Sequence, residues 1–107
     1  VKNKVPLKVL KDFFEENFQN VFEILHILPF YPASSDGGFS VTDHKNVNKD
    51  LGTWNDIRLL SNHVNIMADL ILNHASIKSK WFKSFLKQQK KYKSFFVIFR
   101  KGNIQRL

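Results

Sequence analysis

The pattern of apolar and polar residues predicts a chain that alternates between helices and strands. Apolar residues recur at three- and four-residue steps over residues 7–18, which is the period of an amphipathic helix. Pro6 stands just before this segment, where the missing N–H of a proline costs little. The apolar run over residues 22–28, which is ended by Pro29, predicts a buried strand.

A long segment without a sustained period comes next. Residues 29–52 contain three of the four glycines, so we expect a loop, and loops of this length are typically functional or disordered. Thr53 and Asp56 then fit a capping box, which predicts that a second helix starts at Thr53. The apolar side of that helix is formed by Trp54, Ile57, Leu60 and Val64.

The remaining segments complete an α/β pattern. Residues 66–72 are apolar except for Asp69 and predict a second strand. Residues 81–89 predict a third helix, and residues 95–99 predict a short strand. This order gives a βαβ unit with flanking helices, so we expect an α/β fold. The near-continuous apolar strands suit a parallel sheet that is covered on both faces.

The composition is that of a folded domain. The 107 residues are about one small domain in length, and 43% of them are hydrophobic, including eleven Phe. The absence of Cys excludes a disulfide scaffold and a thiolate metal site. The apolar runs are too short to span a bilayer, and no secretory signal opens the chain. We therefore expect a cytoplasmic protein with no membrane partner.

The net charge of +8 is unevenly distributed along the chain. Residues 1–74 carry seven Lys/Arg and nine Asp/Glu, a balance of −2, whereas residues 75–107 carry ten Lys/Arg and no acidic residue, a balance of +10. Such a block fits a module that binds polyanions such as nucleic acid. It also fits the Lys-rich surface of a larger protein, and we favour this second interpretation, so nucleic acid is not the expected partner.

Common catalytic motifs are absent from the sequence. It contains no P-loop, no GxGxxG and no GxSxG. No metal-ligand spacing relates the four histidines, which are His26, His44, His63 and His74. We expect neither a metal site nor a cofactor.

Polar residues interrupt and follow the second predicted strand. A carboxylate in a buried strand is costly unless it is paired, so we interpret Asp69 as the structural partner of an Arg from elsewhere. Asn73 and His74 stand at the carboxyl end of this strand, where parallel sheets bind ligands. A ligand site and a turn capped by Asn73 explain this pair equally well.

The loop after the first predicted strand contains a second candidate site. Asp36 offers a carboxylate to sugar hydroxyls, and Phe39 offers a ring that can stack on an apolar sugar face. Gly37 and Gly38 allow the backbone to approach a ligand closely. An ordinary turn with a buried Phe39 also fits this segment, and we favour that interpretation when the loop is considered alone.

Four segments in order resemble one known family. They are HILPFYP (residues 26–32), DGGFSVTDH (36–44), LGTW (51–54) and DLILNH (69–74). Together they resemble the alpha-amylase superfamily, glycoside hydrolase family 13. The second and third segments are similar to its branch of sucrose phosphorylases and related glucoside phosphorylases. The resemblance covers residues 7–96.

The resemblance implies a partial (β/α)₈ barrel, a fold of about 250 residues or more. Residues 1–107 would be an incomplete N-terminal part: helix 1, strand 2, helix 2, strand 3 and the following helix. The implied reaction is retaining glucosyl transfer, in which one carboxylate attacks the anomeric carbon and a carboxylic acid protonates the leaving oxygen. Inorganic phosphate then accepts the glucosyl group of sucrose or a related glucoside.

The resemblance also assigns roles to five residues. Asp36, Phe39 and His74 match positions that bind the reacting glucose. Asp69 matches the position that orients the family's catalytic Arg, and Asn73 matches a structural position. The catalytic carboxylates of the family lie outside these motifs, so no catalytic residue is assigned and the chain alone is expected to be inactive.

Two departures from the family pattern leave alternatives open. Ser40 stands where many members carry Asp, and residues 97–107 lack the acidic character of the family and are expected to form a divergent tail. The alternatives to a phosphorylase are an alpha-amylase-type hydrolase and a polyanion-binding module formed by residues 75–107.

Overall fold

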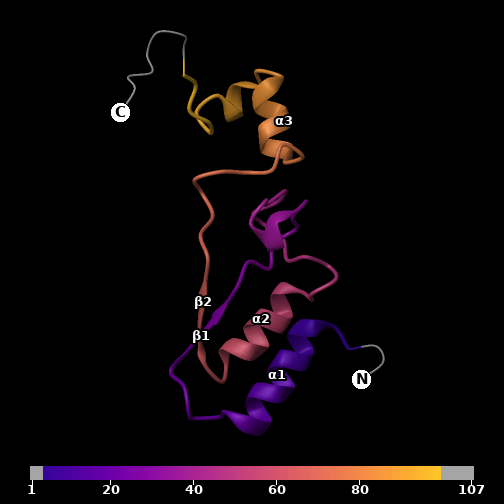
Figure 1. Ribbon diagram of the computed structural model, residues 1–107, viewed down its shortest axis with the longest axis vertical. Coiled ribbons are helices and arrows are strands. Elements are labelled where there is room, and N and C mark those ends of the chain that lie inside the picture. Colours follow the sequence, from indigo (N-terminus) through magenta and orange to yellow (C-terminus); the bar gives the residue numbers. More distant parts are fainter. Residues whose placement is uncertain (1–3, 100–107) are drawn as a thin grey trace.

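The computed structural model describes residues 4–99 as a mixed helical and parallel-strand structure. Figure 1 shows its elements, which in chain order are α1 (Pro6–Asn17), β1 (Ile24–Ile27), η1 (Asp36–Gly38), α2 (Trp54–Ser61), β2 (Asn65–Ala68), α3 (Lys80–Leu86) and η2 (Lys90–Tyr92). The two η elements are single turns of 3₁₀ helix. The predicted divergent tail lies outside the described residues from residue 100 onward.

The two strands form a parallel pair. Ile24 lies opposite Asn65, and Ile27 lies opposite Ala68. The chain leaves β1 through a long loop and returns through α2 to β2, so the predicted βαβ unit is confirmed. Because the strands are parallel, the loops that follow them leave from the same end of the sheet.

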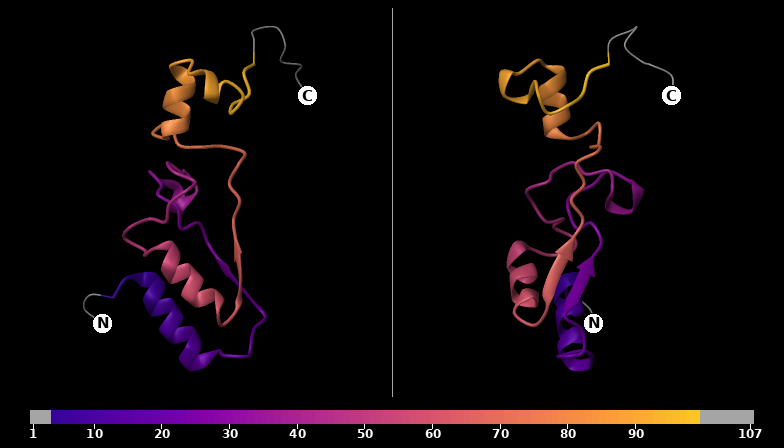
Figure 2. Two further views of the ribbon diagram at one scale, coloured as in Figure 1. Left: turned by 180° about the vertical axis from the view of Figure 1, so that it is seen from behind. Right: turned by 90° about the vertical axis from the view of Figure 1, so that its left-hand side faces the viewer.

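The main core lies between this sheet and the first two helices (Figure 2). Phe14 of α1 packs against Leu60 and Val64, and these side chains are 3%, 0% and 6% exposed. Leu25 and Ile66 point from the strands into the same cluster. Alternate residues of each strand therefore face the helices, as the pleat of a strand requires.

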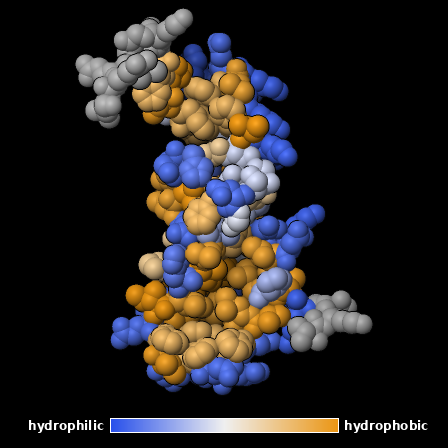
Figure 3. All heavy atoms as spheres, viewed as in Figure 1, coloured by the Kyte–Doolittle hydropathy of each residue, from blue (hydrophilic) through white to orange (hydrophobic). Residues whose placement is uncertain are grey.

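The other face of the sheet is open among residues 4–99. Ile24 is 58% exposed and Met67 is 49% exposed, and the strands are mostly exposed or half-buried. The expectation of a sheet covered on both faces is therefore wrong for the part of the chain that the structure describes. Figure 3 shows the apolar side chains that gather at the surface of the half of the molecule that contains the sheet, α1 and α2.

The capping box at the start of α2 is confirmed. The Thr53 Oγ1 atom accepts a hydrogen bond from the Asp56 N–H, and the Asp56 Oδ2 atom accepts one from the Thr53 N–H at 2.8 Å. Asp56 is only 4% exposed, so this pair satisfies a buried carboxylate as well as the helix terminus. The motif thus fixes where the long loop ends and α2 begins.

Several predicted boundaries are wrong. Both strands are shorter than their apolar runs, and Asp69 lies just after β2 rather than inside it. The third helix ends at Leu86 rather than at residue 89, and residues 95–99 form no strand. Apolar runs extend beyond the pairing because side chains outside the ladder, such as Ile71, are also buried.

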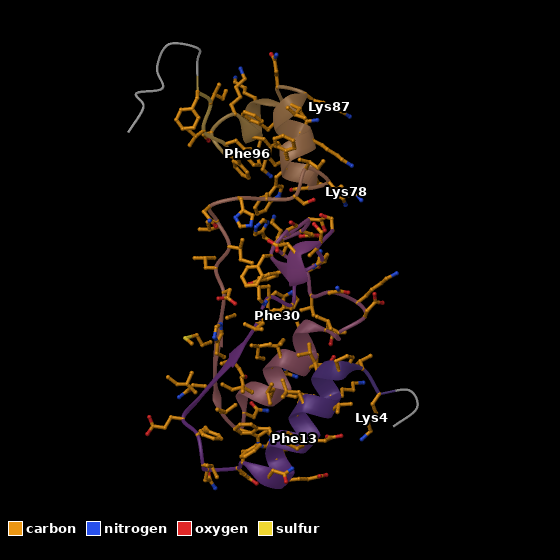
Figure 4. The ribbon with its side chains drawn as sticks, in the orientation of Figure 1. Lys4, Phe13, Phe30, Lys78, Lys87 and Phe96 are labelled. Carbon is orange, nitrogen blue, oxygen red and sulfur yellow. The ribbon has the colours of Figure 1, made fainter. Side chains whose placement is uncertain are left out.

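The third helix stands apart from the main core (Figure 1). The radius of gyration is 18.0 Å, whereas a compact chain of this length has about 13 Å. Figure 4 shows Lys78 and Lys87 on the side of α3 away from Phe96, which packs on Phe82 and Phe85. This helix thus has an aromatic inner side and a basic outer side.

No helix among residues 4–99 is both long enough and apolar enough to cross a membrane.

Candidate functional site

The candidate site is formed by the two loops that follow the parallel strands. The first loop runs from the end of β1 to Thr53, and the second runs from Asp69 to Ser79. Ligands of open parallel sheets bind outside the carboxyl ends of the strands. In this structure the two loops lie against one another at that end, between the main core and α3 (Figure 1).

Serine side chains and backbone groups join the two loops. Ser34 Oγ lies 2.7 Å from Ser76 Oγ, and the Ser76 N–H donates to the carbonyl oxygen of Val41 at 2.9 Å. Ser76 is 5% exposed and Val41 is fully buried. Because buried polar groups are costly when unpaired, these bonds fix the second loop against the first.

Two histidines add further links between the loops. His74 Nε2 donates to the carbonyl oxygen of Phe39 at 3.0 Å, and His44 Nε2 donates to the carbonyl oxygen of Ile71 at 2.9 Å. Each bond crosses from one loop to the other. The structure therefore brings together Phe39 and His74, two residues that the sequence analysis assigned to sugar binding.

The third predicted sugar-binding residue, Asp36, lies in a tight turn with Phe39. Asp36 and Gly37 have φ angles of 62° and 58°, and Gly38 has a φ of 99°. The Phe39 N–H donates to the Asp36 carbonyl oxygen at 3.0 Å. The side chains of Asp36 and Phe39 are exposed, so both are accessible to a ligand, and the prediction of a buried Phe39 in an ordinary turn is wrong.

Gly38 is required by the close approach of two chain segments. A Cβ atom at this position would lie 2.8 Å from the carbonyl oxygen of Pro29. Gly37 also has a positive φ, but a Cβ atom there would meet nothing within 4 Å. The first loop can fold back over the end of β1 only because Gly38 has no side chain.

Asp69 pairs with a residue that the sequence analysis did not select. His26 Nε2 lies 3.2 Å from Asp69 Oδ2, and the two side chains are 39% and 30% exposed. Asp69 is therefore half-buried rather than buried, and His26 is its partner among residues 4–99; the pairing with an Arg from elsewhere stays a prediction. Asn73 is exposed and lines a cavity beside His74.

That cavity has a volume of about 530 Å³ and lies between the second loop and α3. Its polar lining comes from His44, Asn73 and His74, and its aromatic lining comes from Trp81, Phe95, Phe96 and Phe99. A few convergent polar groups on a mostly apolar wall are typical of small-molecule sites. Among residues 4–99, no three His, Cys, Asp or Glu side chains gather closely enough to hold a metal ion.

Asp43 stabilises the middle of the first loop. Its carboxylate accepts a hydrogen bond from the Lys45 N–H at 2.8 Å and another from the Asn46 side chain at 2.7 Å. The Lys45 N–H and then the Asn46 side chain hold the pKa of Asp43 below its ordinary value of 3.8. The adjacent His44 is thereby held in a defined turn.

Sequence reasoning missed His26, His44 and Trp81 as neighbours of the site. His26 and His44 stand within the motifs at residues 26–32 and 36–44, which were considered for other residues, and Trp81 stands at the start of the third predicted helix. No local pattern shows which loop residues meet across the sheet end. The signal that could have indicated His26 and His44 was their position near the carboxyl end of the first predicted strand and in the loop that follows it.

The sequence matches known proteins across most of its length. A family model described as the alpha amylase catalytic domain matches residues 21–106. Over 92 residues, 86% of the chain, the sequence is 48% identical to a glucosylglycerate phosphorylase from Allomeiothermus silvanus. It is 43% identical over 72% of its length to a sucrose phosphorylase from Agrobacterium vitis. The chain spans about 17% and 16% of these two relatives.

The structure also matches a solved phosphorylase. The crystal structure of sucrose 6F-phosphate phosphorylase from Thermoanaerobacter thermosaccharolyticum aligns with a TM-score of 0.71 and 38% sequence identity. The alignment covers 86% of this chain and 21% of that one. The βαβ unit and its loops therefore correspond to part of a larger catalytic domain. By its motifs, its sequence and its structure, the chain belongs to the alpha-amylase family, glycoside hydrolase family 13.

Proposed function

We propose that residues 1–107 are part of the catalytic barrel of a retaining glucoside phosphorylase. The observation that supports this most directly is the identity of 48%, 45% and 42% to three glucosylglycerate phosphorylases. Two sucrose phosphorylases are 43% and 38% identical. We therefore favour a glucoside of glycerate over sucrose as the substrate.

The proposed reaction consists of two displacements at the anomeric carbon. A carboxylate attacks this carbon and forms a glucosyl-enzyme bond, while a carboxylic acid gives its proton to the departing glycosidic oxygen. Inorganic phosphate then attacks the same carbon, the enzyme carboxylate leaves, and glucose 1-phosphate is formed. We assign neither carboxyl group to residues 1–107.

The role of these residues is to bind the glucosyl group. In this proposal Phe39 stacks on the apolar face of the sugar, and Asp36 and His74 hydrogen-bond to its hydroxyls. The loop contacts of His74 and Phe39 support this arrangement because they hold the two side chains in adjacent segments. Asp69 and Asn73 keep the structural roles that the family resemblance gives them.

The test is an assay of the complete polypeptide that carries these residues. It is incubated with phosphate and either glucosylglycerate or sucrose, and glucose 1-phosphate is measured. We expect glucose 1-phosphate from glucosylglycerate at a higher kcat/KM than from sucrose. Release of free glucose at a rate that is independent of phosphate would instead identify a hydrolase and overturn the proposal.

Two variants test the proposed sugar contacts. Phe39→Ala and His74→Ala should each lower kcat/KM by about tenfold to a thousandfold, because these contacts strengthen as the sugar distorts. Phe13→Ala is the matched control, since Phe13 is 52% exposed on α1 and away from the loops (Figure 4). Equal activity of all three variants would rule out the assigned roles.

A further inference from the structure

We infer that His44 is a positioning residue. It holds the segment that carries His74 in the position that sugar binding requires at the carboxyl end of the sheet. This inference rests on the proposed function, because its effect is exerted on a sugar-binding side chain. His44 does not belong to the set of residues assigned to sugar contact. Its contacts join three parts of the molecule: the first loop, the second loop and α3.

The first contact anchors the start of the second loop. His44 Nε2 donates to the carbonyl oxygen of Ile71 at 2.9 Å, and Ile71 is only 5% exposed. A carbonyl oxygen can only accept, so Nε2 carries the proton and the other ring nitrogen, Nδ1, is an acceptor in the neutral ring. Nδ1 is buried and has no hydrogen-bond partner among residues 4–99. Nε2 therefore makes the only hydrogen bond of the His44 side chain among residues 4–99.

The second contact fixes the plane of the His44 ring. The ring stacks on Trp81 with 4.7 Å between the centroids and 5° between the planes. Trp81 lies in the first turn of α3, and its own ring packs edge-on against Phe95 at 5.4 Å. The imidazole is therefore held between the second loop and α3, and its Nε2 points along a fixed direction.

The anchored segment leads directly to His74. Ile71 is held by His44, His74 by the Phe39 carbonyl oxygen, and Ser76 by Val41. These three bonds follow one another along the second loop. When the first is removed, the stretch between Asp69, which pairs with His26, and His74 loses its hydrogen bond to the first loop, so the His74 ring tilts. A displacement of about 1 Å in a substrate-positioning group can cost about a hundredfold in rate.

The test uses three variants of the complete polypeptide. His44→Phe keeps a ring for the stack on Trp81 but removes the N–H donor. His44→Gln removes the ring but keeps an amide N–H that can reach the Ile71 carbonyl oxygen. His63→Gln is the matched control, because His63 pairs with Glu15 at 2.6 Å on the helix side of the sheet.

We expect His44→Phe to lower kcat/KM for the glucoside about tenfold to a hundredfold, and His44→Gln to recover at least a third of the wild-type value. The thermal unfolding temperature should change no more in His44→Phe than in the His63→Gln control. Wild-type kcat/KM in His44→Phe would overturn the inference. So would a loss in His44→Gln as large as in His44→Phe, or a loss of activity that simply follows the loss of stability.

A second measurement separates this inference from the proposed function. Hydrogen exchange of the Ser76 amide, which donates to Val41, is compared in wild type and His44→Phe without any substrate. Faster exchange in His44→Phe, with His63→Gln unchanged, supports the positioning role even if the wild type shows no phosphorolysis. Unchanged exchange in His44→Phe overturns the role whatever the reaction is.

Discussion

His26 and Asp69 meet at 3.2 Å although 43 residues separate them in sequence. His26 lies within β1, and Asp69 is the first residue after β2. In the parallel register His26 faces Met67, so Asp69 lies two residues further toward the carboxyl end. The pair thus links the two strands on the face that the helices leave open, next to the loops of the candidate site.

The partial exposure of this pair limits its effect on stability. Asp69→Asn should lower the free energy of unfolding by less than about 1 kcal/mol, because exposed ion pairs contribute little. The change is measured by chemical denaturation followed through tryptophan fluorescence. A loss as large as that of a core residue would show that the pair is buried in the folded protein.

Replacement of Gly38 by Ala should distort the first loop. The new Cβ would meet the Pro29 carbonyl oxygen at 2.8 Å, and the φ of 99° adds strain, so we expect a loss of about 2–4 kcal/mol. Gly37→Ala is the matched control, because nothing lies within 4 Å of its new Cβ and only about 1–2 kcal/mol of φ strain applies. Denaturation curves compare the two variants, and an equal loss would contradict the steric argument.

Two leucines should differ sharply on truncation to Ala. Leu60 is 0% exposed in the main core, so Leu60→Ala should cost about 2–5 kcal/mol through the cavity that it leaves. Leu70 is 78% exposed, so Leu70→Ala should change stability by less than about 0.5 kcal/mol. The same denaturation assay compares them. A large loss from Leu70→Ala would show that Leu70 is covered in the protein tested.

The capping box predicts a specific loss at the start of α2. Thr53→Ala removes the side-chain cap of the Asp56 N–H and should cost about 1 kcal/mol. Ser61→Ala, at the other end of α2, is the control because its hydroxyl donates only to the Arg58 carbonyl oxygen. Amide exchange in the first turn of α2 should increase in Thr53→Ala alone; equal exchange in both variants would count against the cap.

Asp43 predicts a dependence of stability on pH. Its pKa is lowered in the folded state, chiefly by the Lys45 N–H, so its stabilisation is fully present above the ordinary value of 3.8 that applies in the unfolded chain. The stabilisation is lost as the pH falls through the lower folded value. The difference in unfolding free energy between wild type and Asp43→Asn should therefore shrink from pH 5 to pH 2. Ser61→Ala, which removes no ionisable group, is the control and should show no such trend; a constant difference for Asp43→Asn would contradict the assignment.

The sequence predicted the order of elements because each has a local cause. The period of residues 7–18, the Thr53 cap and the two apolar runs predict α1, α2 and the strands without reference to the rest of the chain. The ends of the strands were wrong since pairing, rather than hydrophobicity, decides where a strand stops. Ile71 is buried beneath loops although it lies outside β2.

The candidate site was only partly predictable. Asp36, Phe39 and His74 were assigned through the family resemblance, which reports which residues matter without giving their contacts. The bond from His74 goes to the backbone of Phe39, and a backbone acceptor leaves no trace in the sequence. His44 and Trp81 meet across 37 residues of chain for the same reason: only the folded loops bring their rings together.

The bonds between the two loops have a consequence for how such a site can be inherited. Ser34 with Ser76, Phe39 with His74 and His44 with Ile71 each take one member from either loop. A chimaera that exchanges one loop with a relative would place one member of each of these contacts against a partner from another protein. Exchange of both loops together would carry the matches along. The pair of loops is therefore the unit that recombination can move between scaffolds, whereas either loop alone is not.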